Sequence, residues 1–202
     1  TYDHEDVVKL SQYSDVPVIN GLTDLLHPCQ VLADLMTIEE HKGNLQGRKL
    51  TYIGDGNNMA NSLMFGGAKT GMDIVIASPS GYEPDAKMIK LAKEDAKFTG
   101  ASIEITSDIK KAAEDADVLY TDVWTSMGQE AETKKRLKDF SSYQINQELI
   151  KLAKDDVIIF HCLPAHRGEE ISEDAIDGPY SVVFDEAENR LHAQKAIMAL
   201  TM

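Results

Sequence analysis

Short apolar runs alternate along most of the chain with segments whose apolar residues recur at helical spacing. The β-prone runs, each bounded by polar or turn-forming residues, lie at 49–53, 73–77, 102–106, 118–121, 157–160 and 181–184. The helical patterns between and after them lie at 58–69, 84–98, 109–114, 129–138, 147–154 and 186–200. This alternation is typical of an α/β protein with a doubly wound, Rossmann-like parallel sheet, which is the fold class we predict.

The N-terminal part of the chain has a different pattern. An amphipathic helix is expected over 3–13, and a short strand followed by a turn over 16–21. Pro28 suits the first turn of a long helix. His27 and Gln30 would then flank a helix N-terminus, where backbone N–H groups and the helix dipole favour an anion. The alternative is that His27 merely caps the helix or lies in the preceding loop.

Polar residues directly after the run at 118–121 form the central candidate for a binding site. Asp122 and Ser126 follow this run, and a charged helical segment comes next. Because ligands of open α/β sheets bind at the carboxyl ends of the strands, Asp122 and Ser126 could clamp an ammonium group. The alternative is that Asp122 caps the next helix and Trp124 packs into the core.

A glycine-rich turn follows the run at 49–53 and invites a dinucleotide-binding interpretation. Gly54 and Gly56 have the right spacing, but the third glycine of that motif is replaced by Met59. The next strand ends in Ser78 rather than an acidic residue for a ribose, so a nicotinamide enzyme is disfavoured. The two asparagines at 57–58 suit another use, in which one amide donates to a ligand carboxylate while the other caps the helix.

The apolar run at 157–160 ends in a His-Cys-Leu-Pro motif at 161–164. This places the Cys162 thiol at the same sheet edge as Asp122, beside a histidine that can hydrogen-bond it or tune it. The alternative is a buried core cysteine. No acyl-enzyme machinery accompanies the thiol, so we do not expect a nucleophile. Cys29 and Cys162 lie in separate motifs without paired spacing, so no metal site is expected.

Arg190 is a cation near the start of the last helical segment, where the helix dipole favours anions. One interpretation is an i, i+4 partner for Glu186, and the other is a ligand for an anion or a carbonyl group in the cleft. The charged faces at 83–97 and 130–138 are interpreted as solvated helix surfaces.

Composition narrows the choice of partners. The 34 acidic and 20 basic residues give a formal charge of −14, which disfavours nucleic acid and anionic membrane surfaces. No apolar run approaches the ~18 residues of a membrane span, and no secretory signal opens the chain. The two cysteines lie in motifs rather than in a disulfide framework, so a cytoplasmic location is expected. Because the sequence opens on Thr1 without Met, we expect that its front has been removed.

Several motifs taken together resemble one family. They are His-Pro-Cys-Gln at 27–30, Gly-Asp-Gly-Asn-Asn at 54–58, Asp-Val-Trp-Thr-Ser-Met-Gly-Gln at 122–129, His-Cys-Leu-Pro at 161–164 and Glu-Ala-Glu-Asn-Arg at 186–190. In this order they resemble the ornithine carbamoyltransferases, and the resemblance extends from Tyr2 to the C-terminus. The Asp-x-x-x-Ser-Met-Gly and His-Cys-Leu-Pro motifs are specific, since aspartate carbamoyltransferases differ at both places.

The resemblance implies that the neutral δ-amine of L-ornithine attacks the carbonyl carbon of carbamoyl phosphate, giving L-citrulline and phosphate without a metal or organic cofactor. The residues it implies in catalysis are His27, Cys162 and Arg190. Those implied to bind carbamoyl phosphate are His27, Gln30, Cys162, Leu163 and Arg190. Those implied to bind ornithine are Asn58, Asp122, Ser126 and Met127. Acetylornithine and putrescine are alternative substrates. Both are disfavoured, because the implied site has ligands for a free α-ammonium group and for a carboxylate.

The resemblance also implies a division of the chain. Residues 1–26 would be the tail of a carbamoyl-phosphate-binding domain, 27–45 a linking helix, 46–185 the ornithine-binding domain, and 186–202 a helix that packs back on the first domain. The family forms trimers, so a homo-oligomer is expected. Its Ser-Thr-Arg-Thr-Arg phosphate-binding segment does not occur in this sequence. We therefore expect the chain alone to be inactive, and the alternative is a stand-alone, inactive amino-acid-binding or interaction module.

Overall fold

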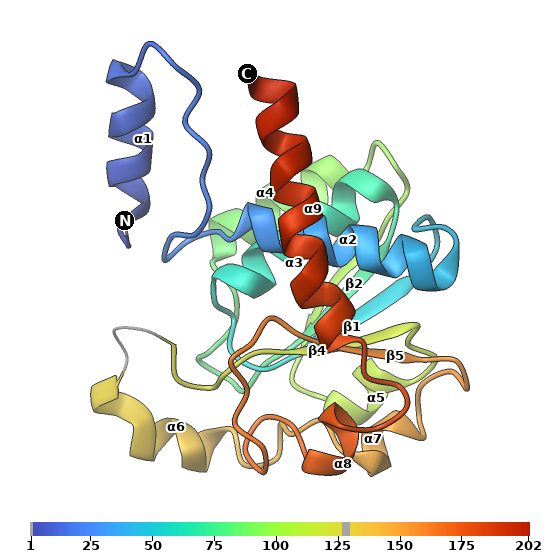
Figure 1. The fold of residues 1–202 in the computed structure, drawn as a ribbon. Coiled ribbons are helices and arrows are strands. Elements are labelled where there is room, and N and C mark those ends of the chain that lie inside the picture. Colours follow the sequence, from blue (N-terminus) through green and yellow to red (C-terminus); the bar gives the residue numbers. More distant parts are fainter. Residues whose placement is uncertain (1, 127–129) are drawn as a thin grey trace.

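A five-stranded parallel sheet forms the centre of the computed structural model, which describes residues 2–126 and 130–202 (Figure 1). The strands are β1 (Lys49–Ile53), β2 (Asp73–Ala77), β3 (Ile103–Thr106), β4 (Val118–Thr121) and β5 (Ile158–His161). Their spatial order is β3-β2-β1-β4-β5, so the chain builds outward from β1 and then returns to the other side of it. The expected doubly wound α/β fold is confirmed.

The register brings the ends of three strands to one edge of the sheet. Tyr52 of β1 pairs with Tyr120 of β4, which in turn pairs with Phe160 of β5. The residues that follow these strands therefore emerge side by side. The strand order reverses between β1 and β4, and ligands of open α/β sheets bind at such a switch point.

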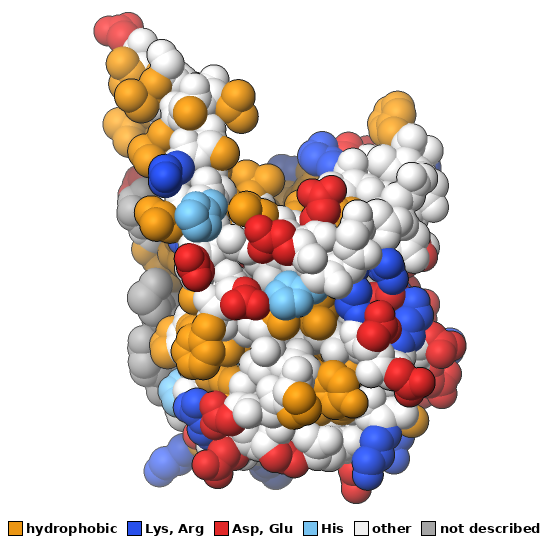
Figure 2. Space-filling model, turned by 45° about the vertical axis from the view of Figure 1, so that its right-hand side comes forward, with side chains coloured by type: hydrophobic (Ala, Val, Ile, Leu, Met, Phe, Trp, Pro, Cys, Tyr) orange, Lys and Arg blue, Asp and Glu red, His pale blue; other side chains and the backbone are white. Residues whose placement is uncertain are grey.

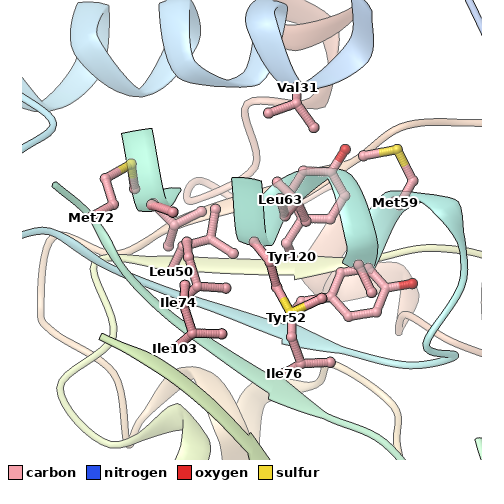
Figure 3. Close-up of a cluster of buried hydrophobic side chains, with 14 of the residues drawn as sticks. Val31, Leu50, Tyr52, Met59, Leu63, Met72, Ile74, Ile76, Ile103 and Tyr120 are labelled. Atoms are coloured by element: carbon pink, nitrogen blue, oxygen red, sulfur yellow. The ribbon is translucent and has the colours of Figure 1, made fainter. Parts of the chain in front are cut away.

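One face of the sheet is covered by four helices (Figure 1). They are α2 (Pro28–Lys42), α3 (Asn58–Thr70), α4 (Ala86–Ala96) and α9 (Val183–Thr201). Figure 3 shows Val31 of α2 above Leu63 of α3 and above the side chains of Leu50, Tyr52 and Tyr120. Burial of these apolar side chains positions α2 and α3 over the strands, with the N-terminus of α3 at the sheet edge where ligands bind.

The other face is covered by shorter helices. These are α5 (Ile109–Ala113), α7 (Gln147–Ile150) and α8 (Glu173–Ile176), with α6 (Thr133–Asp139) and the preceding 3₁₀ turn η1 (Glu130–Glu132) beside them. Trp124 belongs to the hydrophobic core of this face and stacks on Phe140, with the ring centroids 6.0 Å apart. The core interpretation of Trp124 therefore holds.

The strand expected at 181–184 is wrong. Ser181 makes a single parallel bridge to Ile159, and the chain enters α9 at Val183. Asp185 and Glu186 stand in the first turn of α9, where the helix dipole favours acidic side chains. The Val-Val-Phe run is β-prone locally, but Val183 buries its side chain as part of the helix start.

Other local expectations need smaller corrections. Residues 16–19 form no strand, because Pro17 lacks an N–H and the segment lies outside the central sheet. The pattern at 147–154 yields only the short α7, and α8 was not expected. The pattern at 129–138 yields η1 and then α6 rather than one helix.

The two ends of the described chain project from the body of the molecule. α1 (His4–Tyr13) buries none of its residues, and Figure 2 shows hydrophobic side chains on the arm that it forms. The base of the arm is held by Asp24, whose N–H donates to the Tyr2 carbonyl (2.8 Å) and whose carboxylate accepts from the His4 N–H (3.0 Å). α9 crosses α2 and carries the C-terminus outward (Figure 1). Within the described residues, no helix combines the length and apolar character needed to cross a bilayer.

Candidate active site

A cavity of about 290 Å³ opens at the carboxyl ends of β1, β4 and β5. Most of the predicted site residues line it, namely His27, Asn58, Asp122, Ser126, Cys162, Leu163 and Arg190. They come from segments far apart in the sequence, and the sheet register brings them together. Gln30 lies behind Arg190 in a neighbouring cavity of about 330 Å³, and the predicted Met127 lies outside the described residues. The main cavity has the size of a site for a small metabolite.

Asp122 is the most heavily engaged carboxylate in the cavity wall. Its Oδ2 accepts from Asn57 Nδ2 (2.7 Å), and its Oδ1 accepts from the Val123 N–H (2.8 Å) and from the Cys162 thiol (3.2 Å). The cap position of α6 is held by Glu132, so the helix-capping alternative for Asp122 is wrong. The hydrogen bonds fix a buried carboxylate at the end of β4, facing the cavity, where it can receive a cation.

Cys162 is held as a neutral thiol. Burial raises its pKa well above the usual range, and the negative charge of Asp122 raises it further. Thiolate formation at Cys162 is thereby disfavoured. Its contact with Asp122 places a weak donor and acceptor beside a carboxylate at the ends of adjacent strands.

The two asparagines at the start of α3 divide their tasks. Asn57 is the cap, and its Oδ1 accepts from the N–H groups of Met59 (3.0 Å) and Ala60 (3.3 Å) while its Nδ2 holds Asp122. Asn58 lines the cavity and donates from Nδ2 to the Thr23 carbonyl (2.7 Å). The sequence pattern left open which residue caps the helix, and it gave no indication that the cap would also orient Asp122.

The glycines before α3 serve the fold rather than a dinucleotide. A Cβ on Gly56 would lie 2.2 Å from the backbone nitrogen of Pro84 and 2.6 Å from the Tyr82 carbonyl oxygen. The space that a pyrophosphate would need beside this glycine is thus filled by the chain's own backbone. The Gly56 N–H donates to the same Tyr82 carbonyl (2.8 Å), so the turn and the 82–84 loop are fastened together.

Arg136 corrects the interpretation of 130–138 as a wholly solvated face. Its side chain is 7% exposed, and it forms an ion pair with Asp55 (2.7 Å) and donates to the Trp124 carbonyl (3.0 Å). Glu132, four residues earlier in the chain, also accepts a hydrogen bond from Arg136 Nε at its Oε2 (3.2 Å). Arg136 therefore connects the turn after β1 to the loop after β4. Neither the sequence motifs nor the charge pattern pointed to this residue.

His27 and Arg190 form the opposite wall of the cavity. Burial lowers the pKa of His27 to about 4, and the charge of Arg190 contributes to the shift. His27 is thus a neutral imidazole near pH 7, able to donate a hydrogen bond without adding a charge. Arg190 Nη1 donates to Gln30 Oε1 (2.6 Å), and the hydrogen bonds of Glu186 go elsewhere. Arg190 therefore lines the cavity and is not the hydrogen-bond partner of Glu186.

His161 supports the turn that carries Cys162 and Leu163. Its Nε2 contacts Glu170 Oε1 (3.0 Å), and its Nδ1 accepts from the Leu163 N–H (2.9 Å). Leu163 has a φ of 55°, a conformation that β-carbon-bearing residues seldom adopt and that the surrounding contacts must stabilise. Burial raises the pKa of Glu170, but hydrogen bonds from His161 and the His166 N–H outweigh it and hold the pKa below the usual range.

Two side-chain groups have the composition of metal ligands. In the first group, donor atoms of Asp122, His161 and Cys162 lie within 4.8 Å of one another. The second group, formed by the histidine and the two glutamates of the 166–170 segment, is equally close. In the first group both ring nitrogens of His161 are already hydrogen-bonded and the thiol is neutral. In the second group, Glu170 Oε1 accepts from two groups, while its Oε2 has no hydrogen-bond partner among the described residues. The first donor set would have to give up hydrogen bonds to hold an ion.

Comparison with known proteins matches both parts of the chain. Residues 46–201 match the family described as aspartate/ornithine carbamoyltransferase, Asp/Orn binding domain, and residues 1–40 match its carbamoyl-P binding domain. The ornithine carbamoyltransferase of Thermococcus kodakarensis is 60% identical over 201 residues, covering 100% of this chain and 64% of that protein.

Solved structures agree with the sequence comparison. The ornithine carbamoyltransferase of Pyrococcus furiosus superposes with a TM-score of 0.96 at 60% identity, over 100% of this chain and 64% of that one. The enzyme from Gloeobacter violaceus gives 0.93 at 50% identity, over 100% of this chain and 67% of that one. This chain thus spans about 64% of the length of the first relatives it matches. The family match over both parts of the chain shows that it belongs to the aspartate/ornithine carbamoyltransferases.

Proposed function

We propose that this chain supplies the amino-acid-binding part of an ornithine carbamoyltransferase. The reaction joins the δ-amine of L-ornithine to the carbamoyl carbon of carbamoyl phosphate, giving L-citrulline and phosphate, a step of arginine metabolism. The observation that carries the proposal is the Asp122–Cys162 contact of 3.2 Å on the wall of a cavity that Asn58 and Arg190 also line. Ligands for an ammonium, an amine, a carboxylate and a carbamoyl oxygen thus meet around one space.

The ornithine end of the cavity would bind the substrate's α-groups. Asp122 offers a carboxylate and Ser126 a hydroxyl for the α-ammonium, and both line the cavity. Asn58 offers its amide to the α-carboxylate, together with the backbone of Met127, which lies outside the described residues. A substrate lacking either α-group would leave part of this set unpaired, which favours ornithine over putrescine and acetylornithine.

The opposite end would hold the carbamoyl group. His27 can donate without a charge, Arg190 carries a full charge, and the Leu163 carbonyl can accept from the carbamoyl nitrogen. Gln30 holds Arg190 in place. As the δ-amine attacks and negative charge grows on the carbamoyl oxygen, Arg190 and His27 would stabilise that charge.

Cys162 would orient the attacking amine rather than attack. Its neutral thiol lies between Asp122 and the carbamoyl end, where sulfur can contact the δ-nitrogen. The new C–N bond forms as the C–O bond to phosphate breaks, and phosphate leaves with the bonding electron pair. The nitrogen then loses a proton to the departing phosphate or to solvent. Holding both substrates in line is worth several kcal/mol by itself.

We expect the 202-residue chain by itself to form little citrulline. Among the described residues lining the cavity, Arg190 is the one guanidinium or ammonium group. A phosphate dianion needs more positive charge than one half-buried arginine provides. A stand-alone amino-acid-binding module would share the ornithine site but would show no turnover under any assembly. Assaying citrulline formation with and without the remaining part of a related carbamoyltransferase separates the two proposals.

The ornithine site can be tested by calorimetric titration of the chain with L-ornithine. Asp122→Asn should weaken binding at least about tenfold, because a charge-assisted hydrogen bond to the α-ammonium is lost. Asp155→Asn is the matched control, since Asp155 is exposed and precedes β5 at the opposite edge of the sheet. Unchanged ornithine affinity in Asp122→Asn would remove the proposed clamp. Putrescine and N-acetylornithine should bind more weakly than ornithine.

Assembly and location form part of the same proposal. The family resemblance favours a homotrimer for the complete enzyme, and the exposed apolar residues of α1 provide surface for further contacts. Both cysteines are free thiols, in keeping with a reducing compartment such as the cytoplasm. Light scattering on the assembled enzyme would measure its subunit number.

A further inference from the structure

A buried polar cluster lies behind Arg190, where α2 and α9 cross above β4. Asp34 and Glu186 are 0% and 1% exposed, and Gln30 lies between them at 1%. Gln30 Nε2 donates to Asp34 Oδ1 (2.8 Å) and to Glu186 Oε1 (3.0 Å). The cluster stands outside the main cavity, and the proposed reaction uses neither carboxyl group.

The two carboxyl groups are brought together by the shared Gln30 Nε2, and the buried Oδ2 of Asp34 has no hydrogen-bond partner among the described residues. A proton shared by the two groups removes one buried negative charge. Glu186 also accepts from the Tyr120 hydroxyl (3.0 Å) and from the His161 N–H (3.0 Å). None of these donors is a cation.

The charged and titratable groups around the pair do not neutralise two anions. Arg190 of α9 is the nearest cation, and its hydrogen bond goes to Gln30 rather than to either carboxyl group. Tyr120 of β4 is neutral, since burial raises its pKa well above the usual range. Cys162 and Asp122 beyond it add no positive charge. Burial raises the pKa of Asp34 to about 7, and burial together with the neighbouring Asp34 raises the pKa of Glu186.

We propose that Asp34 and Glu186 hold one proton between them near neutral pH and act as a positioning pair for Gln30 and, through it, for Arg190. With both amide hydrogens of Gln30 donated to the pair, its Oε1 is left to accept from Arg190 Nη1 at 2.6 Å. The amide cannot rotate without losing all three bonds. The guanidinium is thus tethered by a neutral oxygen, which leaves its charge for a ligand.

Loss of the shared proton would place two anions beneath Gln30. Their repulsion, together with the pull of a second negative charge on the guanidinium, would loosen the tether and draw Arg190 away from the cavity. The pair therefore makes the geometry of Arg190 dependent on pH. Its importance for catalysis rests on the proposed function, whereas the proton and the tether are properties of the folded chain alone.

The test follows the side-chain amide signals of Gln30 and the side-chain signals of Arg190 by ¹⁵N NMR of the chain between pH 5 and 9. Both should shift together as the pair loses its proton, at a pH well above the ordinary range of aspartate and glutamate side chains. Infrared spectra of ¹³C-Asp-labelled chain should show a protonated carboxyl band at pH 6 that fades with the same midpoint. Gln144, whose amide donates to the carbonyls of Gly168 and Glu169, is the internal control and should not shift.

Variants separate the pair from its neighbours. Asp34→Asn and Glu186→Gln each replace one acid by a neutral group of the same shape, so the neutral-pH titration should disappear from the Gln30 signals. Glu188→Gln, an exposed change on the same helix, should leave it in place. His27→Gln identifies any shift that arises from the imidazole. The unmodified chain already gives the decisive result if a variant fails to fold.

Two results would overturn the proposal. A midpoint near that of exposed carboxyl groups, or the lack of any titration, would mean that no proton is shared. A carboxyl band that titrates near neutrality without movement of the Gln30 and Arg190 signals would mean that the pair positions neither. Citrulline binding by the same chain is measured separately. Failure to bind citrulline at any pH would count against the proposed function while the NMR result still decides the pair.

Discussion

Two arginines lie at the carboxyl edge of the sheet, and their surroundings differ in one respect. Arg136 is bound by the carboxylates of Asp55 and Glu132, so its charge is neutralised inside the molecule. Arg190 is bound by the neutral amide oxygen of Gln30, and its Nε has no hydrogen-bond partner among the described residues. One guanidinium therefore fastens loops together, and the other lines the cavity without a carboxylate partner among the described residues. The partner, not the residue type, decides which task an arginine performs.

The largest expected effect is on stability, and it tests the structural role of Arg136. Arg136→Met breaks a buried ion pair with Asp55, whose side chain is 8% exposed, and we expect the free energy of unfolding to fall by about 3 kcal/mol. Arg190→Met should change it by less than about 1 kcal/mol, because no buried ion pair is lost. Urea denaturation of the two variants measures both values. Equal losses of stability would show that the two arginines do not differ as described.

The next largest effect concerns ligand binding at Arg190. L-Citrulline carries the carbamoyl group on the amino-acid skeleton without phosphate, so it can probe the carbamoyl end of the cavity separately. Arg190→Met should weaken citrulline binding about tenfold to a hundredfold, as expected for loss of a hydrogen bond from a charged group. L-Ornithine, which has no carbamoyl group, should bind with little change. Calorimetric titration with both ligands provides the comparison, and an equal loss for both would contradict the assignment of Arg190.

The smallest effect is the pH dependence of stability that arises from buried groups beside Arg190. The raised pKa of Asp34, about 7, means that the folded chain binds more protons than the unfolded chain between about pH 4 and 7, so this group lowers stability as pH rises. His27, with its pKa lowered to about 4, acts in the opposite direction between about pH 4 and 6.5. In the unmodified chain the two contributions partly cancel.

Variants should uncover each contribution. Asp34→Asn removes the contribution that lowers stability as pH rises. The free energy of unfolding of this variant should therefore rise more steeply with pH than that of the unmodified chain. His27→Gln should do the reverse. Each difference in slope is limited to about 1.4 kcal/mol per pH unit for one proton. Urea denaturation at pH 4.5, 5.5, 6.5 and 7.5 measures these slopes, and parallel curves for all three proteins would contradict the shifts.

Local sequence patterns predicted the strands that form the site because each is a short apolar run between turn residues. Asp122 and Cys162 could be placed from those strands alone, since parallel strands end at a common edge. The false strand at 181–184 has the same local pattern, and only the start of α9 distinguishes it. β-propensity describes a surface that a strand fits, and tertiary packing overrides it.

Long-range polar pairs could not be predicted from the sequence in the same way. Asp34 and Glu186 meet because α2 crosses α9, and no spacing along the chain encodes that crossing. Gln30 and Asp34 do have the i, i+4 spacing of neighbours on one helix face, which was a usable signal for half of the cluster. Arg136 was hidden in a charged segment typical of a solvated surface, although its partner Asp55 lies in the glycine-rich turn.

The pairing of β4 with β5 has a consequence for how this chemistry is preserved. Thr121 of β4 lies opposite His161 of β5, so Asp122 and Cys162 leave the sheet side by side, and the Cys162 thiol comes within 3.2 Å of Asp122 Oδ1. A shift of β5 by a single position would place another residue level with Asp122 and would separate the thiol from the carboxylate. The alignment of two four-residue strands thus determines whether sulfur and carboxylate meet at all.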